Sequence, residues 1–372
     1  MAVTTYGVND ALTVKLWERT LAEEALKATP IAPLIGTSED SIIQKKDELS
    51  STAGDRVTVG LVMQLSGEGR TENQSIEGNE ESLTTYSDNL LINELNHAVR
   101  VRGANTIDNQ RVLFDTRSIG RRRLKDWYAK RLSMGFFHHV GGYVGASYSH
   151  SGFTFDRTKA VFNLSNTITA ASSGRIIWAA AGSGESNTAD EGIESDDVFD
   201  LRYVDYAKEV AQTATPPIRP VMINGEATYV MYLHPYQVTD LRTSTDTGQW
   251  QDIQKAAMMG GKVSGNPIFT GALGMYNNVV LRESWDVCQG YNSSTLATIS
   301  TVRRAVLLGA QAAIYGTGQS FGTAGYKWVE EEFDYKRELG ISVQSLMGLK
   351  KSVFNSTDFG TVVVSTYAAA HT

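Results

Sequence analysis

The feature that most constrains this chain of 372 residues is a pair of strand-like segments joined by a long polar stretch. Apolar residues occupy every second position from Val57 to Leu65, which is the pattern of a strand with one buried face. A polar stretch with three glycines follows over 66–81, and a second strand-like segment runs from Leu83 to Val101. Because a two-stranded ribbon is only marginally stable in water, the pattern predicts an extended hairpin over 54–102 that must lie on another molecule.

The segments on either side of this hairpin are predicted to contain helices. Residues 1–53 form an arm with one helix, which begins after Asn9-Asp10 and ends before Pro30. So short an arm buries little by itself, and a neighbouring subunit is a candidate for stabilising it. Residues 103–140 contain a long helix with an apolar stripe, which begins near Asp108 and ends at Gly141-Gly142.

The middle of the long helix is strongly basic, and two interpretations are open. Its cationic residues are Arg117, Arg121, Arg122, Arg123, Lys125, Lys130 and Arg131. They form either a solvated, ion-paired face or a surface for acidic groups of neighbouring subunits or for DNA. The whole chain has a net charge of -7, which argues against a protein that mainly coats nucleic acid. Among the functional interpretations, a protein–protein contact is therefore favoured.

The rest of the chain predicts a mixed α+β organisation. A glycine- and serine-rich insertion spans 141–197 and ends in an acidic run over 190–197. A helix over 198–213 is expected to be capped by Asp196-Asp197 and to end before Pro216-Pro217. The later blocks are an alternation of strands and helices over 221–325, a strand-rich part over 326–355 and a small polar tail over 356–372.

Motifs for catalysis or metal binding are missing from the sequence. It contains no His-Glu-x-x-His pair and no zinc-finger spacing, and the single Cys288 allows neither an internal disulfide nor a thiolate zinc site. Adjacent helix residues point in different directions, so His138-His139 is interpreted as a helix-end pair and not as a metal site. His234-Pro235 predicts a structural turn. The run over 190–197 lacks the spacing of a calcium loop, so a solvated loop is expected there.

Several short sequences resemble the major capsid proteins of tailed bacteriophages, in the family typified by the short-tailed coliphage N-four. Among them are Ala2-Val3-Thr4-Thr5-Tyr6-Gly7, Asp40-Ser41-Ile42-Ile43-Gln44, Met63-Gln64-Leu65-Ser66-Gly67, Glu77-Gly78-Asn79-Glu80-Glu81, His97-Ala98-Val99-Arg100, His234-Pro235-Tyr236 and Pro267-Ile268-Phe269-Thr270-Gly271. The resemblance is densest over 2–137, resumes over 230–350 and is weakest over 141–197. The order of arm, hairpin, long helix and α+β lobe also resembles the Hong Kong 97 type fold of tailed-phage and herpesvirus capsid proteins.

The resemblance implies an α+β, Hong Kong 97-like subunit with named parts. These are an N-terminal arm (1–53), an E-loop hairpin (54–102), a spine helix of the P-domain (103–140), an insertion (141–197), a P-domain helix (198–220), an A-domain (221–325), strands of the P- or A-domain (326–355) and a C-terminal tail (356–372). It also implies hexamers and pentamers that close into an icosahedral head around double-stranded DNA, which they enclose without sequence specificity. A separate scaffold protein, a portal and decoration or cement proteins are the expected partners.

The resemblance places the predicted assembly contacts on the hairpin, the basic helix and the His234 turn. They are Met63, Leu65, Gly67, Arg70, Glu80, Glu81, Arg117, Arg121, Arg122, Trp127, His234 and Tyr236. In some related shells a Lys–Asn isopeptide bond crosslinks the hairpin tip to a neighbouring subunit. Residues 54–102 contain no lysine, so no such crosslink is expected from this hairpin. No catalytic residue, cofactor or metal is expected.

Three alternatives remain open at this stage. An encapsulin shell would share the fold but would not enclose DNA, and a portal or tail protein would have a different balance of helix and strand. A soluble enzyme with an unmarked site would show a polar pocket and no projecting arm. The sequence has no signal peptide and no apolar run of about 20 residues, so we expect a soluble protein that assembles in the host bacterial cytoplasm and resides in the virion.

Overall fold

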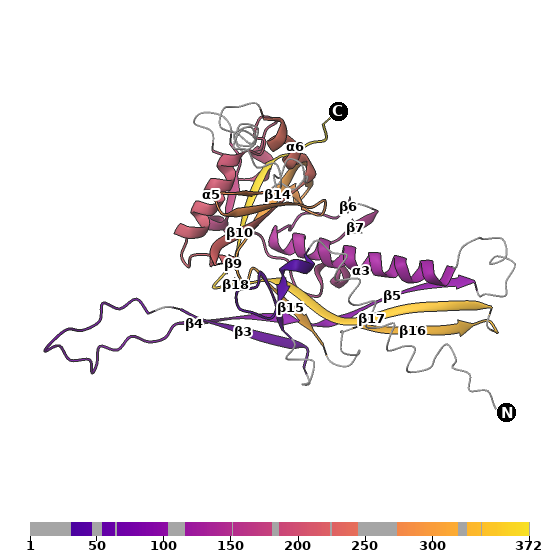
Figure 1. The fold of residues 1–372 in the computed structure, drawn as a ribbon, viewed down its shortest axis with the longest axis horizontal. Helices are drawn as coiled ribbons and strands as arrows, with labels where there is room; N and C mark the ends of the chain where they lie inside the picture. The colour runs from indigo at the N-terminus through magenta and orange to yellow at the C-terminus, as the bar shows by residue number, and fades with distance from the viewer. Residues whose placement is uncertain are drawn as a thin grey trace.

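The computed structural model describes residues 31–46, 54–63, 65–102, 116–150, 152–180, 186–223, 225–244, 274–318, 326–335 and 337–371. They form two lobes from which a long hairpin projects, as Figure 1 shows. Helices and sheets are mixed along the chain, in agreement with the predicted α+β class. The helix predicted near the N-terminus and the predicted helix start near Asp108 lie outside the described residues.

One lobe, here called the spine lobe, is a sheet covered by the long helix α3 (Thr116–Val140). The sheet has the order β1 (Ile35–Gly36), β2 (Ile43–Lys46), β15 (Ala313–Thr317), β17 (Glu338–Lys351) and β16 (Tyr326–Phe333), and β5 (Asn93–Arg102) also pairs with β17. The helix buries Leu124, Tyr128, Leu132 and Phe136, which recur at steps of four residues and therefore share one face. The Tyr128 hydroxyl lies within hydrogen-bond distance of two carbonyl oxygens of the sheet. The helix ends at Val140, before the predicted Gly141-Gly142.

The second lobe, here called the upper lobe, is built on an eight-stranded sheet. Its order is β11 (Met275–Tyr276), β12 (Val279–Glu283), β10 (Glu226–Leu233), β14 (Thr298–Leu308), β20 (Thr361–Tyr367) and β8 (Ile176–Trp178), with β9 (Val221–Ile223) on β10 and β13 (Gln289–Tyr291) on β14. Helices α5 (Leu201–Thr213) and α6 (Pro235–Thr243) belong to this lobe. The remaining pieces are η1 (Ala32–Leu34), β6 (Tyr148–His150), β7 (Phe153–Phe155), α4 (Ala160–Asn163), η3 (Ser173–Arg175), η4 (Asp190–Gly192), β18 (Val353–Phe354) and β19 (Thr357–Asp358).

The hairpin consists of β3 (Arg56–Val62) and β4 (Thr85–Leu91), paired antiparallel in a single register. The prediction of one long second strand from Leu83 to Val101 is wrong. That strand is divided at Ile92, and its second part, β5, pairs with β17 over ten positions inside the spine lobe. The period-two pattern continues through both parts, so the pattern alone could not show that the partner strand changes. The projecting hairpin therefore ends at Leu91.

Four further predictions are corrected by burial and pairing. The tail over 356–372 contains β20, whose residues Val362, Val363 and Val364 are fully buried between β14 and β8. The end of the predicted arm, over 31–46, belongs to the spine lobe through the pairing of β2 with β15. The insertion contributes β8 to the upper sheet. Helix α5 begins after Asp200 instead of Asp196-Asp197, because the Asp200 carboxylate accepts the bond from the Arg202 amide. Among the described residues no helix is long and apolar enough to cross a membrane.

Candidate assembly surfaces

The hairpin tip over 66–82 is held together by its own side chains. One oxygen of Glu81 accepts hydrogen bonds from the Ser66 amide at 2.8 Å and the Ser66 hydroxyl at 3.1 Å, and the other accepts from the Gly67 amide at 2.7 Å. The Arg70 guanidinium donates to Asn79 at 2.8 Å. Glu80 accepts from the Gly78 amide. Four of the predicted contact residues therefore shape the tip, which the sequence alone presented only as a polar loop.

The Glu81 carboxylate should control the order of the tip as a function of pH. Hydrogen bonds from the Ser66 amide, and then from the Gly67 amide, lower the pKa of Glu81 from its usual value of 4.5. A lowered pKa means that this ordering is fully present above pH 4.5 and is lost as the pH falls through the lowered value. We expect Glu81→Gln to raise the amide exchange rates of Ser66 and Gly67 at neutral pH. Glu77→Gln is the matched control, and equal protection in the two variants would contradict this role.

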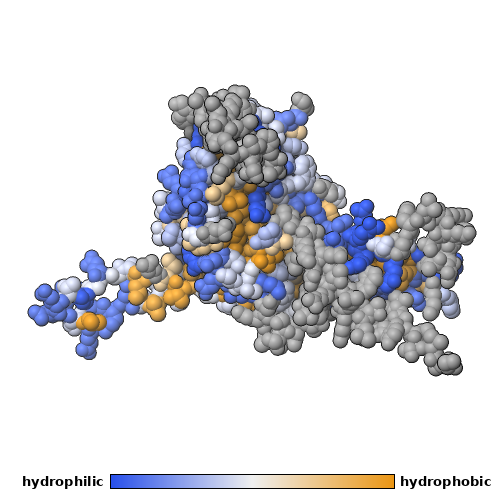
Figure 2. Space-filling model, viewed as in Figure 1, coloured by the Kyte–Doolittle hydropathy of each residue, from blue (hydrophilic) through white to orange (hydrophobic). Residues whose placement is uncertain are grey.

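Several apolar side chains of the hairpin are exposed to solvent. Leu65 is 56% exposed, Ile76 69% and Leu83 65%, while Met63 is half-buried. Figure 2 shows apolar colour along the stem of the hairpin and polar colour at its tip. Within the described chain nothing covers these side chains, and contiguous exposed apolar surface of this kind is typical of interaction sites.

The base of the hairpin is fixed to the body by polar contacts that sequence reasoning missed. The Asp88 carboxylate forms an ion pair with Lys350 and accepts a hydrogen bond from the Val353 amide at 3.1 Å. The side-chain amide of Asn166 accepts from the Leu91 amide and donates to the Leu91 carbonyl, each at 2.9 Å. Because these partners lie far apart in the chain, no local pattern in the sequence could have identified them. The hairpin is thus aimed by its base, while its tip projects away from the body, as Figure 1 shows.

A small cavity lies where the hairpin leaves the body. Its volume is about 220 Å³. Leu61, Met63 and Tyr86 line it from the hairpin, and Phe354 and Phe359 line it from the body. The predicted contact residue Met63 therefore faces a partly apolar gap.

The predicted contacts of the basic helix have different environments. Arg117 forms a bidentate ion pair with the buried Glu330 of its own chain, with a shortest distance of 2.8 Å. Trp127 stacks on His97 with ring centroids 4.3 Å apart. Arg121 is half-buried, whereas Arg122 is exposed. An ion-paired face therefore accounts for part of the basic stretch, and Arg122 lies on the part that faces solvent.

The turn at His234 is structural, as the sequence predicted. His234 directly follows the last residue of β10 and is the N-cap of α6. Its Nδ1 atom accepts a hydrogen bond from the Tyr236 amide at 3.2 Å. Gln237 completes a capping box by accepting from the His234 amide. The pair His138-His139 closes α3, with each imidazole buried and bonded to a different partner. Burial lowers the pKa of His138 to about 3 and that of His139 to about 4, so both are neutral at pH 7.

The prediction of a solvated acidic loop over 190–197 holds for its exposed middle, over 191–196, and is wrong for its two ends. Asp190 and Asp197 are buried. Asp190 forms an ion pair with Arg304 at 2.8 Å and also accepts the Tyr291 amide at 3.0 Å. Burial lowers the pKa of Arg304, but the charge of Asp190 outweighs it and leaves the pKa above its usual value. Among the described residues, no group of His, Cys, Asp and Glu is arranged to hold a metal ion.

An arm that projects from the body with an exposed apolar stem is typical of a subunit that associates with other molecules (Figures 1 and 2). The model of the phage capsid protein family matches residues 5–370, so the chain belongs to that family. A curated relative, the major capsid protein of Pseudomonas phage KPP25, is 26% identical over 95% of this chain and 94% of its own length. The predicted identity as a phage major capsid protein is confirmed, and neither the encapsulin nor the enzyme alternative is supported.

Solved structures agree with this assignment. The capsid of Ralstonia phage GP4 matches with a TM-score of 0.74 and 30% identity over 100% of both chains. The capsid of cyanophage Pam1 matches with a TM-score of 0.72 and 22% identity over 93% of this chain and 94% of that chain. The Hong Kong 97-like fold predicted from the order of the elements is therefore confirmed, and the protein is a structural component of the phage capsid and not an enzyme.

Proposed function

We propose that the chain assembles as hexamers and pentamers into an icosahedral head around double-stranded DNA, with each hairpin lying across the adjacent copy. The observation that carries this proposal is the exposed apolar surface of the hairpin stem, with Leu65 and Leu83 more than half exposed. A neighbouring copy that covered these side chains would remove apolar surface from water, which stabilises association by about 25 cal/mol per Å² before the costs of binding.

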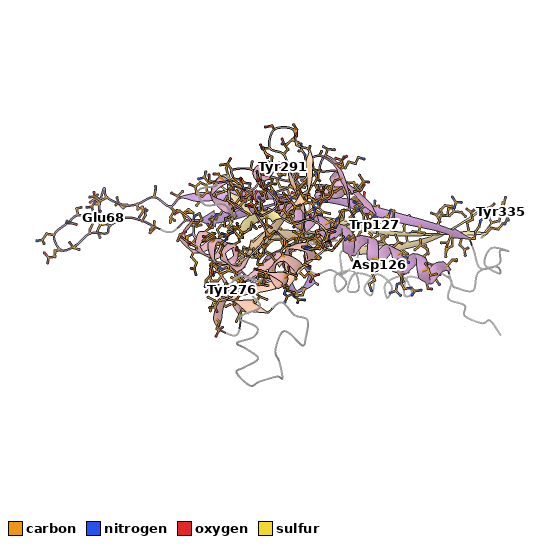
Figure 3. All side chains as sticks on the ribbon, turned by 90° about the horizontal axis from the view of Figure 1, so that it is seen from above. Glu68, Asp126, Trp127, Tyr276, Tyr291 and Tyr335 are labelled. Carbon is orange, nitrogen blue, oxygen red and sulfur yellow. The ribbon has the colours of Figure 1, made fainter. Side chains whose placement is uncertain are left out.

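The distribution of charge supports a head-to-tail contact between copies. The tip over 66–82 contains five glutamates and one arginine, whereas the first half of α3 contains Arg122 and its basic neighbours. These two regions lie at opposite ends of the longest axis, as Figure 1 shows. Figure 3 shows Glu68 at one end and Asp126 and Trp127 of α3 on the other side of the body. A head-to-tail interface generates a closed ring when the rotation from one subunit to the next divides a full turn evenly. Such a ring is the arrangement that a capsomer requires.

The remaining parts of the proposal follow the family resemblance. The hairpin would contact the adjacent copy through Met63, Leu65, Gly67, Arg70, Glu80 and Glu81. On that copy the hairpin would meet Arg121 and Arg122. The helix would be supported by Arg117 and Trp127, and the upper lobe would be supported by His234 and Tyr236. A scaffold protein, a portal and decoration proteins would be separate partners. The hairpin has no lysine, so its contacts would be non-covalent.

A charge-exchange experiment tests the head-to-tail contact. We expect Glu68→Lys and Arg122→Glu each to weaken assembly by about tenfold, because each places like charges together. The double variant should restore shells, since it re-forms an opposite pair. Assembly is measured by sedimentation and electron microscopy of the purified protein with a scaffold partner.

Glu226→Lys, at the exposed start of β10, is the control with the same change of charge away from both surfaces. Normal shells from both single variants would overturn the proposed contact. Failure of the wild-type chain to form any closed shell would overturn the proposed function itself.

A further inference from the structure

A polar cluster lies where β14, the start of α6 and the segment before β13 meet. It is formed by His234, Tyr236, Trp285 and Arg303, with His150 of β6 beside it. The His234 and Tyr236 rings are 4.6 Å apart, and the Arg303 guanidinium carbon is 5.9 Å from the same tyrosine ring. Neither the capping role of His234 nor the proposed contact between the hairpin tip and α3 uses Arg303, Trp285 or the Nε2 atom of His234.

The cluster contains buried hydrogen-bond donors that have no acceptor. In the described part of the chain, Nε and Nη1 of Arg303 and Nε2 of His234 are buried without a hydrogen-bond partner. The Nδ1 atom of His234 accepts from the Tyr236 amide, so in the neutral ring Nε2 carries the proton and is a donor. All three unpaired groups therefore donate. Leaving buried donors unpaired is unfavourable, and more so where the group is charged.

The charges of the neighbouring groups leave the site positive. Arg303 is 7% exposed and His234 is fully buried. The nearby carboxylate, Asp286, is already paired with Lys130 and accepts from Ser133 at 2.6 Å, and His150 lies 3.6 Å from the same carboxylate. Tyr148 and Cys288, which also face Arg303, are neutral at pH 7 because burial raises the pKa of both. The first turn of α6, a helix of nine residues, adds its positive pole.

The backbone of Arg303 is fixed on both sides. Its carbonyl accepts from the Gln237 side-chain amide at 3.2 Å, and its backbone is paired with Gln289 on one side and Thr366 on the other. The sheet therefore fixes the backbone position from which the buried Arg303 side chain extends. Trp285 is 45% exposed and stacks on His150, so it forms the boundary between the cluster and solvent.

We propose that this cluster is a binding site for a phosphate-class oxyanion, held by Arg303 and His234 and bounded by Trp285. A tetrahedral oxyanion offers only acceptors, which is what three unpaired donors at a helix N-terminus require. Two sources share this chemistry, free inorganic phosphate and the phosphodiester backbone of DNA. Anion binding is measured on the unassembled chain. A negative result would therefore not affect the proposed head-to-tail contact.

Calorimetric titration of the full-length chain with inorganic phosphate, at constant ionic strength set with potassium chloride, tests the proposal. We expect Arg303→Met to weaken phosphate binding by about tenfold or more, because two charge-assisted hydrogen bonds are lost. Arg123→Met, an exposed arginine of α3, should bind as the wild type does. Phosphate should also change tryptophan fluorescence in the wild type and not in Trp285→Phe.

The outcomes separate the site from general salt effects and separate its two possible sources. Absence of phosphate binding by the wild type, or equal binding by Arg303→Met, would overturn the site. A short DNA duplex is titrated in parallel. Binding of the duplex that depends on Arg303 assigns the site to the DNA backbone, and binding of phosphate alone assigns it to a free anion. If Arg303→Met does not fold, Arg303→Lys keeps the charge without the Nε and Nη1 donors and should show the same loss.

Discussion

Replacing Asp190 by asparagine should destabilise the unassembled chain by about 3–5 kcal/mol, because it leaves the charge of Arg304 buried without a counter-ion. Both side chains are almost fully buried, with 4% of the Arg304 side chain and 0% of the Asp190 side chain exposed. Arg304 also donates to the carbonyls of Gly141 and Gly142, just beyond the end of α3. The pair thus joins the upper sheet to the spine helix. Since whole domains are stable by about 5–15 kcal/mol, this is a large fraction of the total.

Urea unfolding of the purified chain measures this loss, and the exposed pair of Arg123 and Asp126 provides the control. These two side chains lie 3.8 Å apart and are 78% and 60% exposed. Asp126→Asn should therefore cost less than about 0.5 kcal/mol. A loss below about 1 kcal/mol for Asp190→Asn would show that Arg304 finds another partner or water, and would contradict the structural role of the buried pair.

The elements of the fold were predictable where a local sequence pattern indicates a helix or a strand. Alternating residues indicated β3, the apolar stripe indicated α3, and glycines marked the end of that helix. Partner strands were harder to predict, because alternation shows that a strand has a buried face but does not show which strand covers it. This is why β4 and β5 were predicted as one strand, and why β20 was missed inside a short segment of small residues.

The contacts that shape the candidate assembly surfaces could not be predicted from the sequence. The polar tip was identified, but its clamp by Glu81 depends on a turn geometry that the sequence does not specify. The acidic run was assigned to solvent because charged residues are usually exposed, and Asp190 is an exception only because Arg304, far along the chain, lies beside it. Contacts of this kind are set by the fold, and no spacing rule predicts them.

The hairpin base should be most sensitive to a substitution that adds a single carbon. A Cβ at Gly348, in β17, would lie 2.0 Å from the Leu91 carbonyl oxygen, so the backbone of one strand would have to move. Leu91 is the last residue of β4 and is held there by the Asn166 side-chain amide. We expect Gly348→Ala to destabilise the chain by about 1–3 kcal/mol, the range typical of overpacking. It should also reduce the yield of closed shells, because every subunit would present a displaced hairpin.

Gly60→Ala is the matched control, since it makes the same change in the projecting strand β3, where a Cβ would meet no atom within 4 Å. Its stability should rise by about 0.4–1 kcal/mol, because alanine restricts the unfolded chain more than glycine does. Urea unfolding and sedimentation of shells measure both effects. If Gly348→Ala loses stability but still forms normal shells, the hairpin is aimed by its neighbours after contact. If shells fail while the subunit stays folded, the base aims the hairpin before contact, and the direction of the arm is a property of the single chain.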